Sequence, residues 1–287
     1  MDKNVYSILE KYVPSRIAEQ IKSVLQEALR LEAIPIEENL IPVGTSKLGG
    51  LPDLPRMFEW PSWNGKPLGF ITQINLAELP KFDFLKTLPL SGLLSFFYSA
   101  EQETWGFYPS DKGSWKVVFF TEVSNLERRN FPLNLTGDGK YKSCSLKFHH
   151  SITFPPWEST SIQELSLTRE EEDHYFEFGE KLQEYLREDT EFVHRLLGYP
   201  IQIQGDMQIQ CQLLSNGWNT GDPETYRNPL AKKLYERAND WQLLLQIDSD
   251  QAAGMTWGDV GRIYYWIRKE DLQAANFDST WMILQCS

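Results

Sequence analysis

The fold is decided by a short stretch that occurs twice, first as Phe70-Ile71-Thr72-Gln73-Ile74-Asn75 and again as Leu243-Leu244-Leu245-Gln246-Ile247-Asp248. Both stretches are mostly apolar and have the length of a buried β-strand. Residues two apart on a strand share a face, so Gln73 lies beside Asn75 and Gln246 lies beside Asp248. The chain is therefore expected to contain the same sheet position twice, each time with an amide and a second polar group.

The elements around these two stretches also follow one order. A long amphipathic helix and a Leu-Gly pair come first, and a Gly-led aromatic strand and a Trp-led strand follow. The matching landmarks are Leu48-Gly49, Gly92 and Trp115 in the first half, and Leu197-Gly198, Gly261 and Trp281 in the second. Loop lengths differ slightly, as diverged copies would tolerate. We predict an internal duplication, with halves near residues 15–150 and 166–287 joined by a connector near 149–167.

Two segments have the spacing of long amphipathic helices. The stripe from Ile17 through Val24 to Leu31 predicts a helix that ends near Pro35. A second helix is expected after Thr168, because Glu171 three residues later completes a capping box. Strict alternation over 207–213 predicts a strand, and Asp138-Gly139 predicts a hairpin turn. The expected fold class is α+β: one domain over 1–287 with an extensive, mostly antiparallel or mixed sheet.

The composition excludes several classes of function. The formal net charge is −12, from 40 acidic against 28 basic residues, so phosphate backbones and anionic membrane surfaces are disfavoured as partners. The three cysteines form no CxxC pair, so neither a zinc site nor a redox pair is indicated. No apolar run reaches the roughly 18 residues that a membrane span needs. We expect a soluble cytoplasmic protein without metal or cofactor; the oligomeric state stays open.

Several segments resemble the YwqG-like family, a set of mostly bacterial proteins of unknown function. The similar segments are 48–52, 60–61 and 67–76 in the first half, and 197–200, 204–207, 211–213, 243–250, 255–261 and 283–286 in the second. The resemblance covers roughly residues 40–287. It implies an α+β fold with extensive sheet, and it implies no catalytic residues.

Few residues offer chemistry beyond structure. Trp257-Gly258-Asp259 is the sharpest local motif, and we interpret Asp259 first as a turn cap before the strand that starts at Gly261. Asp248-Ser249-Asp250 has oxygen ligands for a cation but lacks the glycine spacing of a calcium loop. His149 and His150 are adjacent, so on a strand they face opposite ways. The sequence contains no phosphate-binding loop and no nucleophile elbow.

The candidate binding residues are Gln73, Asn75, Gln246, Asp248, Trp257 and Asp259. Two interpretations of them remain open: the polar pairs bond to the backbone inside the fold, or they line a shared cleft between the halves. We expect a non-catalytic intracellular binding protein, with a protein partner such as a basic toxin or enzyme that it antagonises. The alternative is a small-ligand enzyme or hydrolase at the junction, with Asp248 and Asp259 as acid or base. A scaffold that self-associates through a sheet edge is the third hypothesis.

Overall fold

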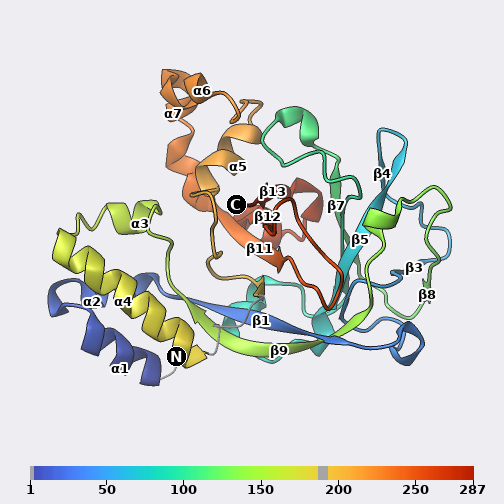
Figure 1. Ribbon diagram of the computed structural model, residues 1–287, viewed down its shortest axis with the longest axis horizontal. Helices are drawn as coiled ribbons and strands as arrows, with labels where there is room; N and C mark the ends of the chain where they lie inside the picture. The colour runs from blue at the N-terminus through green and yellow to red at the C-terminus, as the bar shows by residue number, and fades with distance from the viewer. Residues whose placement is uncertain (1–2, 187–192) are drawn as a thin grey trace.

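The computed structural model describes residues 3–186 and 193–287, and one large antiparallel sheet dominates it (Figure 1). Its strands are β1 Gln26–Pro35, β2 Lys47–Leu48, β4 Ser62–Trp63, β5 Lys66–Asn75, β6 Leu93–Ser99, β7 Trp115–Phe120, β9 Cys144–Thr153, β10 His194–Leu196, β11 Trp241–Asp248, β12 Arg262–Arg268 and β13 Trp281–Gln285. A small separate sheet pairs β3 Asp53–Pro55 with β8 Leu126–Arg128. The expected strands around both decisive stretches, β5 and β11, are confirmed.

The helices lie outside this sheet (Figure 1). They are α1 Lys3–Tyr12, α2 Ser15–Val24, α3 Thr160–Gln163, α4 Arg169–Leu186, α5 Gln208–Leu214, α6 Pro223–Arg227, α7 Pro229–Lys232 and α8 Lys269–Gln273. Among the described residues, no helix is both long and apolar enough to cross a membrane.

The strand order is arranged evenly about the central pair β1–β9. Outward from that pair, one side runs β2, β5, β6 and β7, which we call the first sheet half. The other side runs β10, β11, β12 and β13, which we call the second sheet half. The sheet curls until its two edges approach each other. At that point Trp115 of β7 packs edge-on against Trp281 of β13, with ring centroids 5.0 Å apart. The result is a sheet nearly closed into a barrel.

The two sheet halves share their register at the decisive stretches. Gln73 of β5 pairs with Lys47 of β2, and Gln246 of β11 pairs with Arg195 of β10. A β-bulge lies directly after Phe70 in one half and directly after Leu243 in the other. Phe70 and Leu243 each stand three residues before the glutamine of their strand. A bulge inserts one extra residue and re-aims the strand, so its recurrence at one position is a specific structural match.

The match is inexact at the edge strands. Trp115 pairs with Tyr98, whereas Trp281 pairs with Trp266. Counted from the bulges, Trp115 and Trp281 stand one residue out of register. The expected equivalence of these two tryptophans is therefore wrong, and they instead meet each other where the sheet edges approach.

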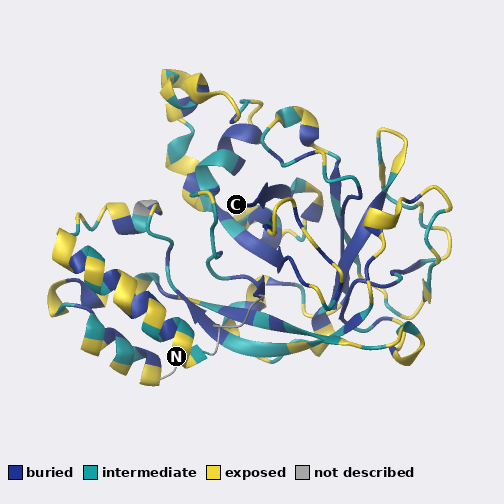
Figure 2. Cartoon of the chain, in the orientation of Figure 1, coloured by how far each residue is buried: buried dark blue, intermediate teal, exposed yellow. Residues whose placement is uncertain are grey.

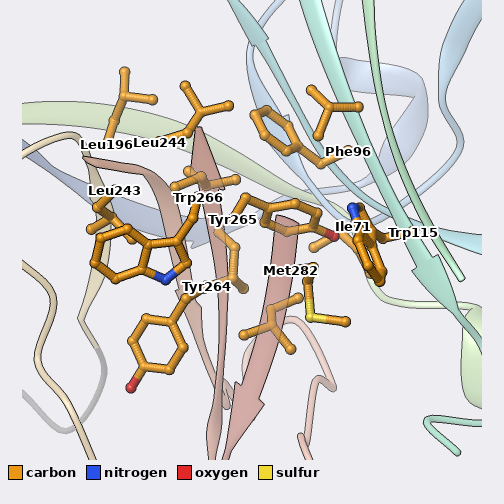
Figure 3. Packing of buried hydrophobic residues seen from close by; sticks show 14 of the residues in the cluster. Ile71, Phe96, Trp115, Leu196, Leu243, Leu244, Tyr264, Tyr265, Trp266 and Met282 are labelled. Atoms are coloured by element: carbon orange, nitrogen blue, oxygen red, sulfur yellow. The ribbon is translucent and has the colours of Figure 1, made fainter. Parts of the chain in front are cut away.

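The main core lies between the two sheet halves (Figure 3). Tyr265 of β12 extends toward Phe96 of β6, with ring centroids 5.1 Å apart, and its hydroxyl donates to the Phe97 carbonyl at 3.1 Å. Tyr264 and Trp266 lie on the opposite face of β12, which we call the outer face of the second sheet half. The high aromatic content thus serves chiefly as core.

A helical layer of α1, α2 and α4 packs on one end of β1 and β9 (Figure 1). The predicted capping box is confirmed, because the Glu171 carboxylate accepts from the Thr168 N–H at 2.9 Å and α4 starts at the next residue. Arg16 of α2 donates twice to the same carboxylate, at 2.6 and 2.5 Å. This contact holds α2 against the start of α4.

The predicted helix over 17–31 is wrong in its second part. The helix ends at Val24, and Gln26–Pro35 forms β1, which pairs with β9 along its full length and with β10 at its centre. The helices are therefore not equivalent in the two halves: α1 and α2 precede β1, while α4 follows β9. Strand pairing on both edges of Gln26–Pro35 stabilises the segment more than its helix propensity favours a helix.

Three further expectations fail. Residues 208–214 form α5, not a strand, because Met207 and Cys211 share a helical face toward the core. Asp138-Gly139 lies in a 3-10 turn, not a hairpin, and β9 runs only from Cys144. It continues to Thr153, so the first residues of the predicted connector are strand.

Candidate functional site

Gln73 is fully buried and joins the two sides of β2. Its Oε1 accepts from the Asp53 N–H at 2.9 Å, and its Nε2 donates to the Thr45 carbonyl at 2.8 Å and to Asp53 Oδ2 at 2.6 Å. Thr45 precedes β2 and Asp53 follows it. The amide therefore holds both connections of that short strand in place.

Gln246 does the same for β10. Its Oε1 accepts from the Ile201 N–H at 2.8 Å and its Nε2 donates to the Val193 carbonyl at 2.7 Å. Val193 lies two residues before Arg195 and Ile201 lies six after it, which matches the spacing of Thr45 and Asp53 about Lys47. The two glutamines thus make the same pair of backbone bonds, each within its own sheet half. The structure does not bring them together.

Their neighbours follow the same rule. Asn75 donates to the Gly44 carbonyl at 2.7 Å and accepts from the Ala77 N–H at 3.0 Å. Asp248 accepts from the Arg262 Nε at 2.7 Å and from the Val193 N–H at 3.1 Å. Each polar pair does share a face, as its spacing predicts. These bonds match the first interpretation, with the polar groups satisfied inside the fold.

The motif at 257–259 splits between core and surface. Trp257 is fully buried, donates to the Asp248 carbonyl at 3.1 Å, and packs against Tyr98 and Tyr141 of the first half at 6.1 and 5.6 Å. Gly258 takes a positive φ of 53°, and Asp259 beside it is exposed. The two carboxyls proposed as acid and base therefore occupy unlike environments, Asp248 buried in an ion pair and Asp259 in solvent. A binding role for either one stays a prediction.

Asp250 forms a buried pair with His194. The His194 Nε2 lies 3.0 Å from Asp250 Oδ2, and its Nδ1 accepts from the Asp248 N–H at 3.1 Å, which places the ring proton on Nε2. Burial alone would raise the pKa of the Asp250 carboxyl, but the bonds from His194 and backbone N–H groups lower it below its ordinary value. The carboxylates of 248–250 are thus engaged. No group of three His, Cys, Asp or Glu in the described residues is placed to hold a metal ion.

One charged cluster of the first sheet half was not anticipated. Lys47 is fully buried, its Nζ lies 2.7 Å from Glu38 Oε1, and it also donates to the Leu51 carbonyl. Arg128 binds Asp53 Oδ1 through Nε at 2.5 Å and also contacts Glu38. Burial lowers the pKa of Lys47. The sequence carries only a weak sign of this cluster, since its members come from segments 90 residues apart.

A groove runs between the second sheet half and the α3–α4 segment. It contains two adjoining pockets of about 210 and 130 Å³, which share Pro156, Pro200 and Gln202 in their walls. The smaller pocket reaches Trp241 and Trp266 on the outer face. The Trp266 Nε1 and the Gln202 Oε1 are buried without a hydrogen-bond partner in the described part of the chain. None of the six predicted binding residues lines either pocket.

Comparison with known proteins identifies the family and no function. A search of curated proteins finds no match. A family model for a domain of unknown function, DUF1963, matches residues 46–286, which covers both sheet halves from β2 to β13 and leaves out α1, α2 and β1. The protein therefore belongs to the DUF1963 family of domains of unknown function.

Proposed function

We propose that this protein is a non-catalytic binding protein whose partner is a basic protein. The observation that carries the proposal is the outward face of α4. Glu170, Asp173, Glu177 and Glu180 recur there at helical spacing, and we call them the acidic face. They lie opposite the buried stripe that includes Tyr175 and Phe178, and Figure 2 shows the exposed side of this helix.

The acidic face differs from an ordinary solvated helix in two ways. None of its four carboxylates has an ion-pair partner within residues 3–186 and 193–287, whereas Glu184 at the end of the helix pairs with Lys181. Helix-dipole compensation explains acids only in the first turn, and Glu177 and Glu180 lie beyond it. Their mutual repulsion is therefore a cost that a cationic partner would relieve.

An aromatic anchor stands among these charges. Phe176 is 50% exposed, lies three residues after Asp173 and four before Glu180, and packs on Trp157 with ring centroids 5.4 Å apart. Exposed aromatic side chains at the centre of a charged rim are typical of energetic hot spots in protein interfaces. A basic partner with an apolar contact point would be steered by the charge and held by the ring. Antagonism of a basic toxin or enzyme is one function that fits.

The experiment compares two variants of equal charge. One neutralises the acidic face through Glu170→Gln, Asp173→Asn, Glu177→Gln and Glu180→Gln. The control neutralises four exposed acids elsewhere through Glu37→Gln, Glu59→Gln, Glu122→Gln and Glu236→Gln. Each immobilised protein is incubated with lysate of its native cells at low and high salt.

We expect a stoichiometric partner that the wild type and the control retain at low salt and that the acidic-face variant loses. Phe176→Ala should weaken the same complex with no change in charge. Equal recovery by the acidic-face variant would contradict the proposal, and so would recovery of no stoichiometric partner at either salt concentration.

The same proposal includes ancestry and location. We infer that the two sheet halves descend from one duplicated unit and that the chain is a YwqG-like member of its family. The shared bulge and the glutamine bonds support the duplication. Three free, buried cysteines, Cys144, Cys211 and Cys286, are in keeping with a reducing cytoplasm. Across family members, residues at matched register should resemble each other more than residues shifted by one position, and equal similarity would contradict the duplication.

A further inference from the structure

Trp60 is one of several side chains that cover the outer face of the first sheet half. Trp60 packs edge-on against Phe97 of β6 with ring centroids 5.9 Å apart, and its Nε1 donates to the Leu68 carbonyl of β5 at 2.8 Å. Phe97 in turn packs on Phe70 at 5.5 Å. An indole ring thus occupies this face and satisfies the strand carbonyl beneath it.

The second sheet half has the same face with different residues. Phe70 pairs with Phe97 directly before the bulge, and Leu243 pairs with Trp266 directly before the matching bulge. Counting two residues back from Phe70 and from Leu243 leads to Leu68 and Trp241. Trp266 therefore stands where the first half has Phe97, and the Trp241 carbonyl stands where the first half has the Leu68 carbonyl.

That second carbonyl is satisfied by a much smaller group. The Gln208 Nε2 donates to the Trp241 carbonyl at 2.6 Å, which is the bond that Trp60 makes in the first half. The amide lacks the bulk of an indole, and the space beside it remains as the 130 Å³ pocket. Gln208, Trp241, Leu243 and Trp266 all line that pocket. The second half thus has open space beside the carbonyl that an indole covers in the first half.

Two residues in the wall of this pocket have an unsatisfied polar atom. Trp266 is 3% exposed, and its Nε1 is a donor without an acceptor in the described residues. The Gln202 Oε1 is an acceptor without a donor there. A buried polar group without a hydrogen bond destabilises the fold, so a ligand that satisfies both atoms would recover that free energy. Phe97, which stands at the position of Trp266 in the first half, has no polar atom.

We propose that this pocket binds a flat, neutral heterocycle that carries a carbonyl beside a ring N–H, as a nucleobase or a lactam does. The carbonyl would accept from Trp266, the ring N–H would donate to Gln202, and the ring would lie where Trp60 lies in the first half. This site is separate from the acidic face of α4. The loss of either proposal leaves the other standing.

The test titrates uracil into the full-length protein and follows the indole N–H resonances by heteronuclear NMR. Comparison with Trp266→Phe assigns the resonance of Trp266. We expect uracil to shift that resonance saturably, and 1,3-dimethyluracil, which keeps the carbonyls but lacks the N–H groups, to bind about tenfold more weakly. Glucose, which is polar but not flat, should leave the resonance unchanged.

Variants place the ligand in the pocket. Gln208→Trp should fill the space as Trp60 does and abolish binding. Trp266→Phe should bind uracil about tenfold more weakly, as measured from the remaining resonances of that variant. Trp60→Phe is the matched control in the first half and should leave uracil binding unchanged. An unmoved Trp266 resonance at millimolar uracil, undiminished binding by Trp266→Phe, or stronger binding of glucose than of uracil would each overturn the proposal.

Discussion

Each sheet half has a glutamine that bonds to the backbone on both sides of a short strand, and we call this arrangement the amide clamp. The residues around the clamp differ between the two halves. Gln73 and Gln246 make the same pair of backbone bonds around β2 and β10. Around β2 the position six residues after Lys47 is Asp53, a fully buried carboxylate bound to Arg128. Around β10 the matching position is Ile201, which contributes its backbone groups. The comparison indicates that the amide clamp is what this sheet requires, while the charged cluster is a local solution of one half.

The largest expected effect separates the two surroundings. Asp53→Ala would leave Arg128, Gln73 and the Gly44 N–H without their buried acceptor. We expect it to lower the free energy of unfolding by about 4 kcal/mol, because removing one partner of a buried ion pair strands the other. Ile201→Ala should cost about 1 kcal/mol, since only part of an apolar side chain is lost. Urea denaturation measures both, and equal losses would show that the halves are not different here.

The outer faces give the next largest contrast. Trp60→Ala would open a cavity against Phe97 and leave the Leu68 carbonyl without its donor, and we expect a loss of about 3 kcal/mol. Gln208→Ala should cost about 1 kcal/mol, because it removes one hydrogen bond at a site that is already open. Thermal and urea unfolding of the two variants would test this, and the reverse order would contradict the view that Trp60 fills space that Gln208 leaves open.

The clamp itself should have a similar cost in the two halves. Gln73→Ala and Gln246→Ala each strand a buried N–H and a buried carbonyl, so each should cost about 2 kcal/mol, with Gln73→Ala slightly higher because it also removes the bond to Asp53. Because the two sites share no partner, the double variant should show the sum. Gln251→Ala, at an exposed position, is the control and should stay within about 0.5 kcal/mol of wild type. A strongly non-additive double variant would mean that the two clamps communicate.

The smallest effect concerns the helical layer. Helix α4 of this layer lies between β9 and β10, whereas the segment between β1 and β2 contains no α-helix. The hydrogen bonds from Arg16 and from the Thr168 N–H lower the pKa of Glu171 to about 2. A depressed folded-state pKa stabilises the fold above the unfolded value of about 4.3, and that stabilisation is lost as the pH falls toward 2. The thermal midpoint of the wild type should therefore fall more steeply from pH 5 to pH 2.5 than that of Glu171→Gln. Glu172→Gln is the control and should follow the wild type; parallel curves for wild type and Glu171→Gln would contradict the assignment.

Local patterns were sufficient where neighbours along the chain decide the structure. The capping box at Thr168 and Glu171 is confirmed because both partners lie within one helical turn. The strands β5, β6, β11 and β12 are confirmed because their apolar runs are buried on both faces. The shared face of Gln73 and Asn75 follows from strand geometry alone.

Local patterns failed where distant partners decide. Gln26–Pro35 has good helix formers, yet β9 and β10 pair with it from both sides and make it a strand. The alternation at 207–213 suits a strand, yet Met207 and Cys211 reach the core as a helix. Neither outcome has a signal within the segment. The same holds for the pocket at Trp266, whose walls come from residues between Gln26 and Lys269.

Composition and spacing along the chain were enough to establish an acidic chain and to predict an α+β fold with one sheet position occurring twice, because charge and strand periodicity are local properties. They were not enough to show that the matched glutamines bind backbone, that Trp115 meets Trp281, or that Gln208 stands where Trp60 stands. Those facts depend on which distant segments the sheet brings into register. A strand can pair with several distant segments, and which pairing is the most stable depends on the tertiary structure as a whole.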